Sequence, residues 1–274
     1  MVAVAAKQVV RSLLPRAVLN WRETQYFSRH GEIEMHLLQF LCRSGQDAID
    51  VGANYGGYVH FMRRYARRVI AYEPMPEFVR LLREKFPRQI VISQIALSDR
   101  TGTAELCMPT IDGTVLSGCS TIAAGAAATY PAYRTIEVRT DRLDNVYDGQ
   151  VGFIKIDVEG HEQAVLDGAV DTLRRCLPRL LVEVDDHLSP GGLMRTRAFM
   201  TDLGYRGYFV HTRRLEPIER FSVVEMQSQT NAPDLKASLR DRPAFGHYIN
   251  NFIFLPPGEP DETPQGMRKH LASL

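Results

Sequence analysis

The sequence contains few cysteines, almost no net charge and no long apolar run. Its four cysteines, Cys42, Cys107, Cys119 and Cys176, form neither a CxxC motif nor a dense disulfide framework, which indicates a reducing, cytoplasmic setting. The 33 Lys and Arg residues nearly balance the 32 Asp and Glu residues, so no overall field attracts nucleic acid. No apolar run approaches the roughly 18 residues that span a bilayer. We therefore expect a globular protein that recognises its partner locally.

The two ends of the 274-residue chain differ in character. The first 22 residues carry basic but no acidic side chains, together with an apolar stripe at helical spacing. Such a stripe is typical of a helix packed on a core, so membrane association is the less favoured alternative. We expect residues 1–44 to form a helical segment over the core. The stretch PPGEPDETPQG has no apolar period, which predicts a flexible tail over residues 256–274.

The middle of the chain shows the pattern of βα units around a parallel sheet, which predicts one domain over residues 45–255. The predicted strands are 47–51, 69–73, 90–97, 153–158, 180–185 and 206–210, with an antiparallel edge strand at 251–255. The predicted helices are 57–68, 76–86, 161–175 and 193–203. The alternation stops at residues 102–143, which we interpret as an inserted hairpin whose loop covers the substrate. We expect this insertion and residues 222–248 to select the substrate.

A glycine-rich turn, DVGANYGG, follows the first predicted strand. Its glycines allow the backbone to approach a ligand closely. The dinucleotide fingerprint GxGxxG would place a second glycine where Asn54 stands. The leading acid, Asp50, suits a cation better than a phosphate. The turn therefore favours S-adenosylmethionine, which carries a sulfonium, with Asp50, Gly52, Asn54 and Gly56 as binding residues.

Polar residues also end the next two predicted strands. Glu73 stands 23 residues after Asp50, where a carboxylate accepts hydrogen bonds from the ribose hydroxyls of an adenosine. After the third strand, Ala96, Ser98 and Asp99 are placed to meet the adenine edge. All four residues are predicted to bind the cofactor.

The fourth predicted strand and its end, FIKIDVEGHE, carry unusual charges. Central parallel strands are normally continuous apolar runs, whereas Lys155, Asp157 and Glu159 alternate and so point to one side. Burying ionised groups is costly unless they are paired, so this row indicates a functional site. The alternative is a structural Lys155–Asp157 ion pair followed by acids that favour the next helix.

Five segments, in order along residues 45–187, carry a family resemblance: AIDVGANYGGY, AYEPMPEFVRLL, ALSDRTGTAEL, FIKIDVEGHEQAVLDGA and LLVEVDDH. They resemble the FkbM-type family of S-adenosylmethionine-dependent methyltransferases. The resemblance implies a class I methyltransferase (Rossmann-like) α/β fold, with a seven-stranded, mostly parallel sheet, an antiparallel last strand and helices on both faces. It further implies O-methylation of hydroxyls on sugars or secondary metabolites. The Asp50–Gly56 turn and Glu73 would hold the cofactor, and Asp157 with Glu159 would lie by the methyl group. We transfer no role to Ser120 or to Asp185 and Asp186, where the match is loose.

Methyl transfer to an alcohol requires removal of the hydroxyl proton. We predict Asp157 or His161 as the base, Lys155 as a partner that orients the carboxylates, and Glu159 as a contact for acceptor hydroxyls. A metal is the alternative way to acidify a hydroxyl, with Mg²⁺ or Mn²⁺ held by Asp157, Glu183 and His187.

Three functions remain in competition. The first is methylation of a small-molecule or glycan hydroxyl, on a glycolipid, polysaccharide or glycosylated natural product. An NAD-dependent oxidoreductase or epimerase is disfavoured by the missing second glycine and by the lack of a Tyr-x-x-x-Lys pair after the fourth strand. A methyltransferase-like domain that only binds is the third. Most of the predicted strands end in acidic residues. Because the strand ends meet in one cleft, we expect a locally acidic pocket there.

Overall fold

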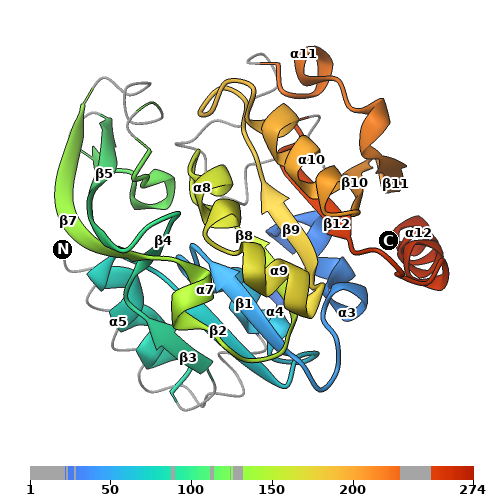
Figure 1. Cartoon of the computed structure of the whole chain (residues 1–274), viewed down its shortest axis with the longest axis horizontal. Coiled ribbons are helices and arrows are strands. Elements are labelled where there is room, and N and C mark those ends of the chain that lie inside the picture. Colours follow the sequence, from blue (N-terminus) through green and yellow to red (C-terminus); the bar gives the residue numbers. More distant parts are fainter. Residues whose placement is uncertain are drawn as a thin grey trace.

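The computed structural model describes residues 22, 24–27, 29–87, 90–111, 114–123, 125, 132–228 and 248–274. Its main feature is an eight-stranded sheet (Figure 1). In order across the sheet, the strands are β11 (Arg214–Pro217), β10 (Arg206–His211), β12 (Asn251–Leu255), β9 (Arg179–Glu183), β8 (Val151–Ile156), β1 (Asp47–Val51), β2 (Arg68–Tyr72) and β3 (Ile90–Ser93).

Strands β3, β2, β1, β8 and β9 are parallel, and β12 is antiparallel to both of its neighbours. The mostly parallel α/β class predicted from the sequence is confirmed, with β11 as an eighth strand. The predicted edge position of 251–255 is wrong, because β12 lies between β9 and β10. All five of its residues are buried, and an edge would leave one side of such an apolar strand unpaired.

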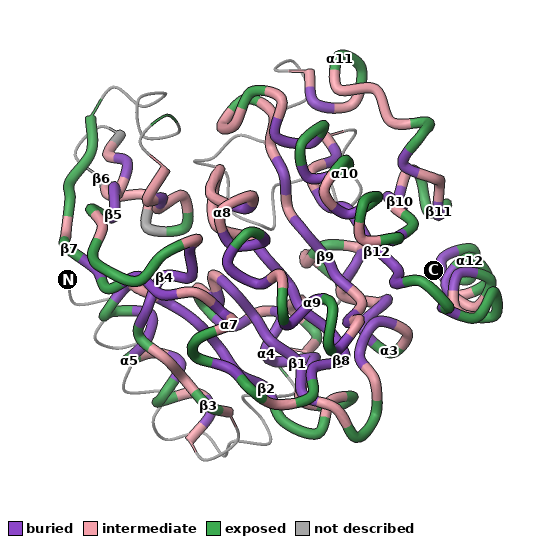
Figure 2. The backbone as a smooth tube through the Cα atoms, in the orientation of Figure 1, coloured by how far each residue is buried: buried purple, intermediate pink, exposed green. Residues whose placement is uncertain are grey.

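Two apolar cores cover the two faces of the sheet. The central strands are buried along their length, whereas the helices are buried mainly on their inner side (Figure 2). Helices on one face are α7 (Leu143–Val146), α8 (Glu162–Asp167), α9 (Val170–Cys176) and α10 (Gly192–Asp202). Helices on the other face are α3 (Leu38–Leu41), α4 (Gly57–Met62), α5 (Pro76–Lys85) and α12 (Glu262–Ser273), with the 3-10 helix η1 (Ile33–Leu37). The remaining short elements are η2 (Ser117–Cys119), η3 (Ile218–Arg220) and α11 (Val223–Met226).

A second sheet lies at the left of Figure 1, on the far side of the molecule from α12. Its order is β4 (Ala96–Leu97), β7 (Tyr133–Asp141), β5 (Gly102–Ile111) and β6 (Thr114–Val115). The strand predicted at 90–97 is therefore divided, since β4 leaves the main sheet to pair with β7. Strands β5 and β7 form the antiparallel pair of the inserted segment.

The helix predicted at 161–175 is also divided, into α8 and α9. The break falls at Gly168, where an added Cβ would lie only 1.9 Å from the Ser98 carbonyl oxygen. The chain must therefore come close to the end of β4 here, and this contact interrupts the helix.

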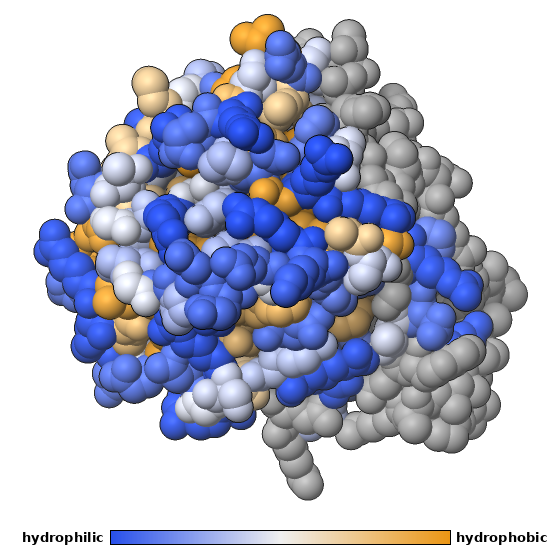
Figure 3. Space-filling model, turned by 90° about the vertical axis from the view of Figure 1, so that its right-hand side faces the viewer, coloured by the Kyte–Doolittle hydropathy of each residue, from blue (hydrophilic) through white to orange (hydrophobic). Residues whose placement is uncertain are grey.

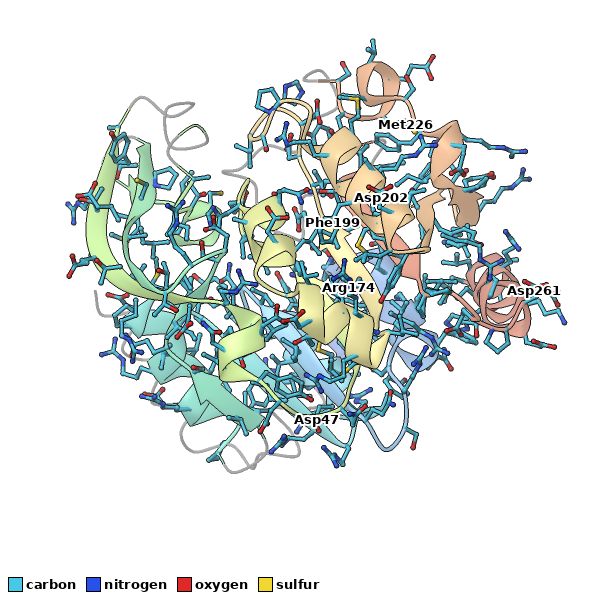
Figure 4. The ribbon with its side chains drawn as sticks, viewed as in Figure 1. Asp47, Arg174, Phe199, Asp202, Met226 and Asp261 are labelled. Carbon is cyan, nitrogen blue, oxygen red and sulfur yellow. The ribbon has the colours of Figure 1, made fainter. Side chains whose placement is uncertain are left out.

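The predicted flexible tail is wrong for residues 262–273, which form α12 against the side of the sheet. Met267 and Leu271 are fully buried, and their spacing of four residues gives the helix one apolar side. Before the helix, the Glu259 carboxylate binds Arg43 at 3.0 Å and Arg179 at 2.6 Å. Figure 4 shows Asp261 at the start of this helix.

No helix within the described ranges is both long and apolar enough to cross a bilayer. On the face that carries α12, hydrophilic side chains predominate and hydrophobic ones form small scattered groups (Figure 3). Of the predicted N-terminal helical segment, residues 1–21 lie outside the described residues.

Candidate functional site

A pocket of about 580 Å³, including the space at its open mouth, lies where β1, β2 and β8 end. Figure 4 places Asp47, the first residue of β1, at the lower edge of the molecule, so the pocket is at the opposite end of that strand. Its walls come from the main sheet and from the inserted segment. The lining residues are Val51, Gly52, Asn54, Tyr72, Glu73, Pro74, Phe78, Ile95, Ala96, Leu97, Leu106, Gly118, Ser120, Ile122, Asp157, Val158, Glu159 and His161.

The turn after β1 brings the backbone against the end of β8. Gly52 has φ +79°, and a Cβ there would lie 1.9 Å from the Asp157 carbonyl oxygen, so only glycine fits. Asn54 follows with φ 48°, a left-handed conformation that asparagine tolerates. Gly56 has φ +76° and faces Leu82, outside the pocket lining. The predicted turn therefore places Gly52 and Asn54 at the pocket, with Gly56 behind them.

Glu73 lies at the end of β2 and is 5% exposed. Its Oε2 accepts a hydrogen bond from the Asn54 backbone amide at 2.8 Å, and its Oε1 accepts one from Met75 at 2.9 Å. Burial raises the pKa of Glu73 to about 7, although these two amides oppose the shift. The carboxylate is thus fixed in place with lone pairs left on both oxygens.

The side of the pocket next to β4 is apolar, lined by Tyr72, Phe78 and Leu97. His161 lies at this side, with its Nε2 2.9 Å from the Ser98 Oγ. Ser98 donates in turn to Asp99 Oδ1 at 3.0 Å. Burial lowers the pKa of His161, so the ring is neutral at neutral pH. Ser98 and Asp99, predicted to touch the cofactor, lie outside the lining, and Ser98 orients His161.

On the other side of the pocket, Asp157 is paired with a buried lysine. The Lys155 Nζ donates to Asp157 Oδ2 at 2.7 Å and lies 4.6 Å from the centre of the Tyr58 ring. Burial lowers the pKa of Lys155, but the charges of Asp157 and Asp50 outweigh it and raise the pKa overall. Asp50 pairs with Lys155 in the β1–β8 register and is 1% exposed, outside the lining. Burial raises the pKa of Asp50 to about 6 against the opposing charge of Lys155.

Glu159 lines the pocket from a left-handed backbone conformation, with φ 53°. Burial, followed by the charges of Asp157 and Glu162, raises the pKa of Glu159 well above its usual range. A non-glycine residue in this conformation is strained by roughly 1–3 kcal/mol, and such strain is concentrated at functional sites.

A family model described as "Methyltransferase FkbM domain" matches residues 50–206. The chain belongs to the FkbM methyltransferase family. This is a family of S-adenosylmethionine-dependent enzymes, and the strand order fits their class I fold, with antiparallel β12 inserted beside the parallel strands.

Solved structures of methyltransferases resemble this FkbM-family chain. A methyltransferase FkbM from Methylobacillus flagellatus KT is 15% identical with a TM-score of 0.47, covering 77% of this chain and 44% of its own. This chain thus matches less than half the length of that protein. An rRNA methylase from Streptococcus thermophilus is 10% identical (TM-score 0.41; 82% and 93% covered). A SAM-dependent O-methyltransferase from Thermotoga maritima is 13% identical (TM-score 0.37; 80% and 62% covered). No curated protein matches the chain.

The metal hypothesis receives no support in this FkbM-family chain. Among the residues that the structure describes, no three His, Cys, Asp or Glu side chains converge as a metal site. The His187 Nε2 lies 2.6 Å from the Gln227 carbonyl oxygen, and Glu183 accepts a hydrogen bond from Asn250. The predicted ligands Asp157, Glu183 and His187 therefore do not form a coordination set.

Asp186 and Asp185, left without a role by the sequence, have structural partners. The Asp186 carboxylate accepts from the backbone amides of Gly191 at 3.1 Å and Leu193 at 3.2 Å, which caps α10. Asp185 accepts from the Tyr248 hydroxyl at 2.6 Å. Of the acids predicted to gather in one cleft, Glu73, Asp157 and Glu159 line the pocket.

The inserted segment contributes lining residues that the sequence did not identify: Leu106, Gly118, Ser120 and Ile122. The sequence gives Ser120 no role because its match to the family is loose, yet Ser120 and Ile122 line the pocket. The signal in the sequence was that these residues lie within the insertion at residues 102–143. Of the residues suggested to select the substrate, 112–113, 124, 126–131 and 229–247 lie outside the described part.

Proposed function

We propose that this chain is an O-methyltransferase that transfers the methyl group of S-adenosylmethionine to a sugar hydroxyl, on a glycolipid, polysaccharide or glycosylated natural product. The observation that carries the proposal is that the described lining of the pocket has acidic side chains and neither lysine nor arginine. It contains three carboxylates and one histidine. Such a pocket favours a cationic cofactor and a neutral acceptor over any phosphate-bearing ligand.

The residues present fit this cofactor. The Glu73 carboxylate is fixed with lone pairs available for the two ribose hydroxyls, and the apolar side of the pocket offers Tyr72 and Phe78 to an adenine ring. The Asn54 Oδ1 is buried without a partner among the described residues and can accept from a donor of the ligand. NAD fits less well, because its pyrophosphate would face Glu73, Asp157 and Glu159.

When bound, the cofactor supplies an electrophilic methyl group on a positively charged sulfur. The protein must align the acceptor oxygen and take its proton. Asp157 suits this task, because it lines the pocket, Lys155 holds one of its carboxylate oxygens, and its side chain is 25% exposed. His161 lies at the apolar side, where its neutral ring suits contact with the adenine. We therefore assign the base to Asp157 and a cofactor-binding role to His161.

Two measurements test this assignment. Calorimetry should detect S-adenosylhomocysteine binding to the wild type, and the absence of binding at millimolar ligand would refute the proposal. Asp157→Asn should lower kcat by about 100-fold or more with little change in cofactor affinity, whereas His161→Asn should mainly weaken that affinity. The exposed Asp148→Asn is the control and should change neither. The reverse pattern in the two variants would assign the base to His161.

A further inference from the structure

Polar side chains of four adjacent strands lie side by side on the sheet face covered by α4. In the registers of the sheet, Asp50 pairs with Lys155, and Asn251 pairs with Glu183. Asp157 and Glu183 stand one residue beyond the last registered pair of β8 and β9, so they are neighbours on this face. The order β12, β9, β8, β1 therefore gives a continuous polar row near the carboxyl end of the parallel strands.

The segment before η1 closes over this row. Tyr58, whose ring lies over Lys155, donates its hydroxyl to Glu32 Oε2 at 2.5 Å. The Asn251 Nδ2 donates to the same oxygen at 3.1 Å. We refer to Glu32, Asp50, Asp157 and Glu183, with Lys155 and Asn251, as the acidic cluster.

Carboxylates outnumber the positive charge in the acidic cluster. Four carboxyl groups share the Lys155 ammonium, and that ammonium is hydrogen-bonded to Asp157. Burial, and then the charges of Asp157 and Glu32, raise the pKa of Glu183 well above its usual range. Because Lys155 is the cation of this cluster and is already paired with Asp157, the cluster offers an incoming anion no free positive charge.

Two buried acceptors of the cluster have no partner within the described part of the chain. They are the Asp50 Oδ1, on a residue 1% exposed, and the Asn251 Oδ1, on a residue 5% exposed. An unpaired buried acceptor is destabilising, so such atoms are normally satisfied by water or a ligand. An occupant of this place must bring hydrogen-bond donors.

The acidic cluster meets the cofactor pocket at Asp157, which also lines the pocket. We infer that the cluster is the acceptor site, where Glu32, Glu183 and Asn251 bind adjacent hydroxyls of an uncharged sugar ring and hold one of them beside Asp157. The inference rests on the proposed function and specifies its substrate. Sugars with a phosphate or carboxylate at this place are rejected by the surrounding carboxylates.

The test uses four neutral probes and two charged ones, with labelled S-adenosylmethionine as methyl donor. The neutral probes are the methyl α-glycosides of D-glucose, D-mannose, D-galactose and L-rhamnose, and the charged probes are the 6-phosphates of glucose and mannose. At least one neutral glycoside should be methylated, with kcat/KM at least about tenfold above that of either charged probe. Glu183→Gln and Glu32→Gln should raise KM for that glycoside at least about tenfold, while the Kd of S-adenosylhomocysteine changes less than about twofold. The exposed Glu84→Gln should change neither value.

The outcomes separate the two proposals. If the wild type binds S-adenosylhomocysteine but methylates none of the glycosides, the acceptor site is overturned and the cofactor site stands. Unchanged KM values in both variants would likewise show that the cluster holds only water. A wild type that does not bind S-adenosylhomocysteine would overturn the proposed function itself. Retained cofactor affinity in the variants shows that they are folded.

Discussion

The affinity for the cofactor should depend on pH through Glu73. Burial raises the pKa of Glu73 to about 7, yet its proposed task is to accept hydrogen bonds from two ribose hydroxyls as a carboxylate. At pH 6 only about one-eleventh of this group is ionised, and at pH 8 about ten-elevenths. If only the ionised form binds, the Kd of S-adenosylhomocysteine is about tenfold higher at pH 6 than at pH 8. This corresponds to about 1.4 kcal/mol of binding free energy.

Calorimetry measures both the affinity and the protons exchanged. Binding at pH 6, repeated in buffers of different ionisation enthalpy, should release close to one proton. Glu73→Gln should bind more weakly at every pH, because it loses the charge, and should show no pH dependence between 6 and 8. His161 is another titratable side chain of the pocket lining, so His161→Asn is needed as a control and should retain the slope.

The exposed Glu77→Gln, four residues along the chain, should behave like the wild type. A Kd that changes less than twofold between pH 6 and pH 8 would refute the reasoning. The same slope in Glu73→Gln as in the wild type would assign the titration to another group, such as Asp50 with its pKa of about 6.

Two further predictions concern the turn and the unliganded protein. Gly52→Ala and Gly45→Ala both place a side chain at positive φ, but only Gly52→Ala also collides with the Asp157 carbonyl oxygen. Gly52→Ala should therefore raise the Kd of S-adenosylhomocysteine at least about tenfold, and equal Kd values for the two variants would contradict this. Burial raises the pKa of Glu73 and Glu162 from 4.5 to about 7, so between these values the folded chain binds more protons than the unfolded chain. The urea midpoint of the unliganded protein should consequently fall from pH 5 to pH 8, and a rising midpoint would be inconsistent with buried, raised carboxyl groups.

The sequence predicted which strand ends meet at the pocket, because the signals for them are local. Gly52 and Asn54 follow a buried strand at once, and polar residues such as Asp157 interrupt an otherwise apolar strand. In a parallel sheet such positions must meet at one edge, so the pattern is sufficient to bring them together. Gly52, Asn54, Glu73 and Asp157 accordingly line one pocket.

Features that depend on long-range pairing were not predicted. The apolar sequence of β12 does not indicate which strands it will pair with. Its place between β9 and β10 is decided by packing. The position of Ser98 after a predicted strand suggested contact with the cofactor. Its hydroxyl instead forms a hydrogen bond with His161, 63 positions away in the sequence. The helix α12 was missed because its proline-rich start concealed the apolar spacing of Met267 and Leu271.

The position of β12 also matters for how the protein is made. Asn251 reaches the acidic cluster only after β12 has inserted between β9 and β10, although every other member of the cluster has left the ribosome long before. Before β12 is made, β10 and β11 can pair with each other but have no connection to β9 in the sheet. A nascent chain stalled before residue 251 should therefore expose the unpaired side of β9 to other chains.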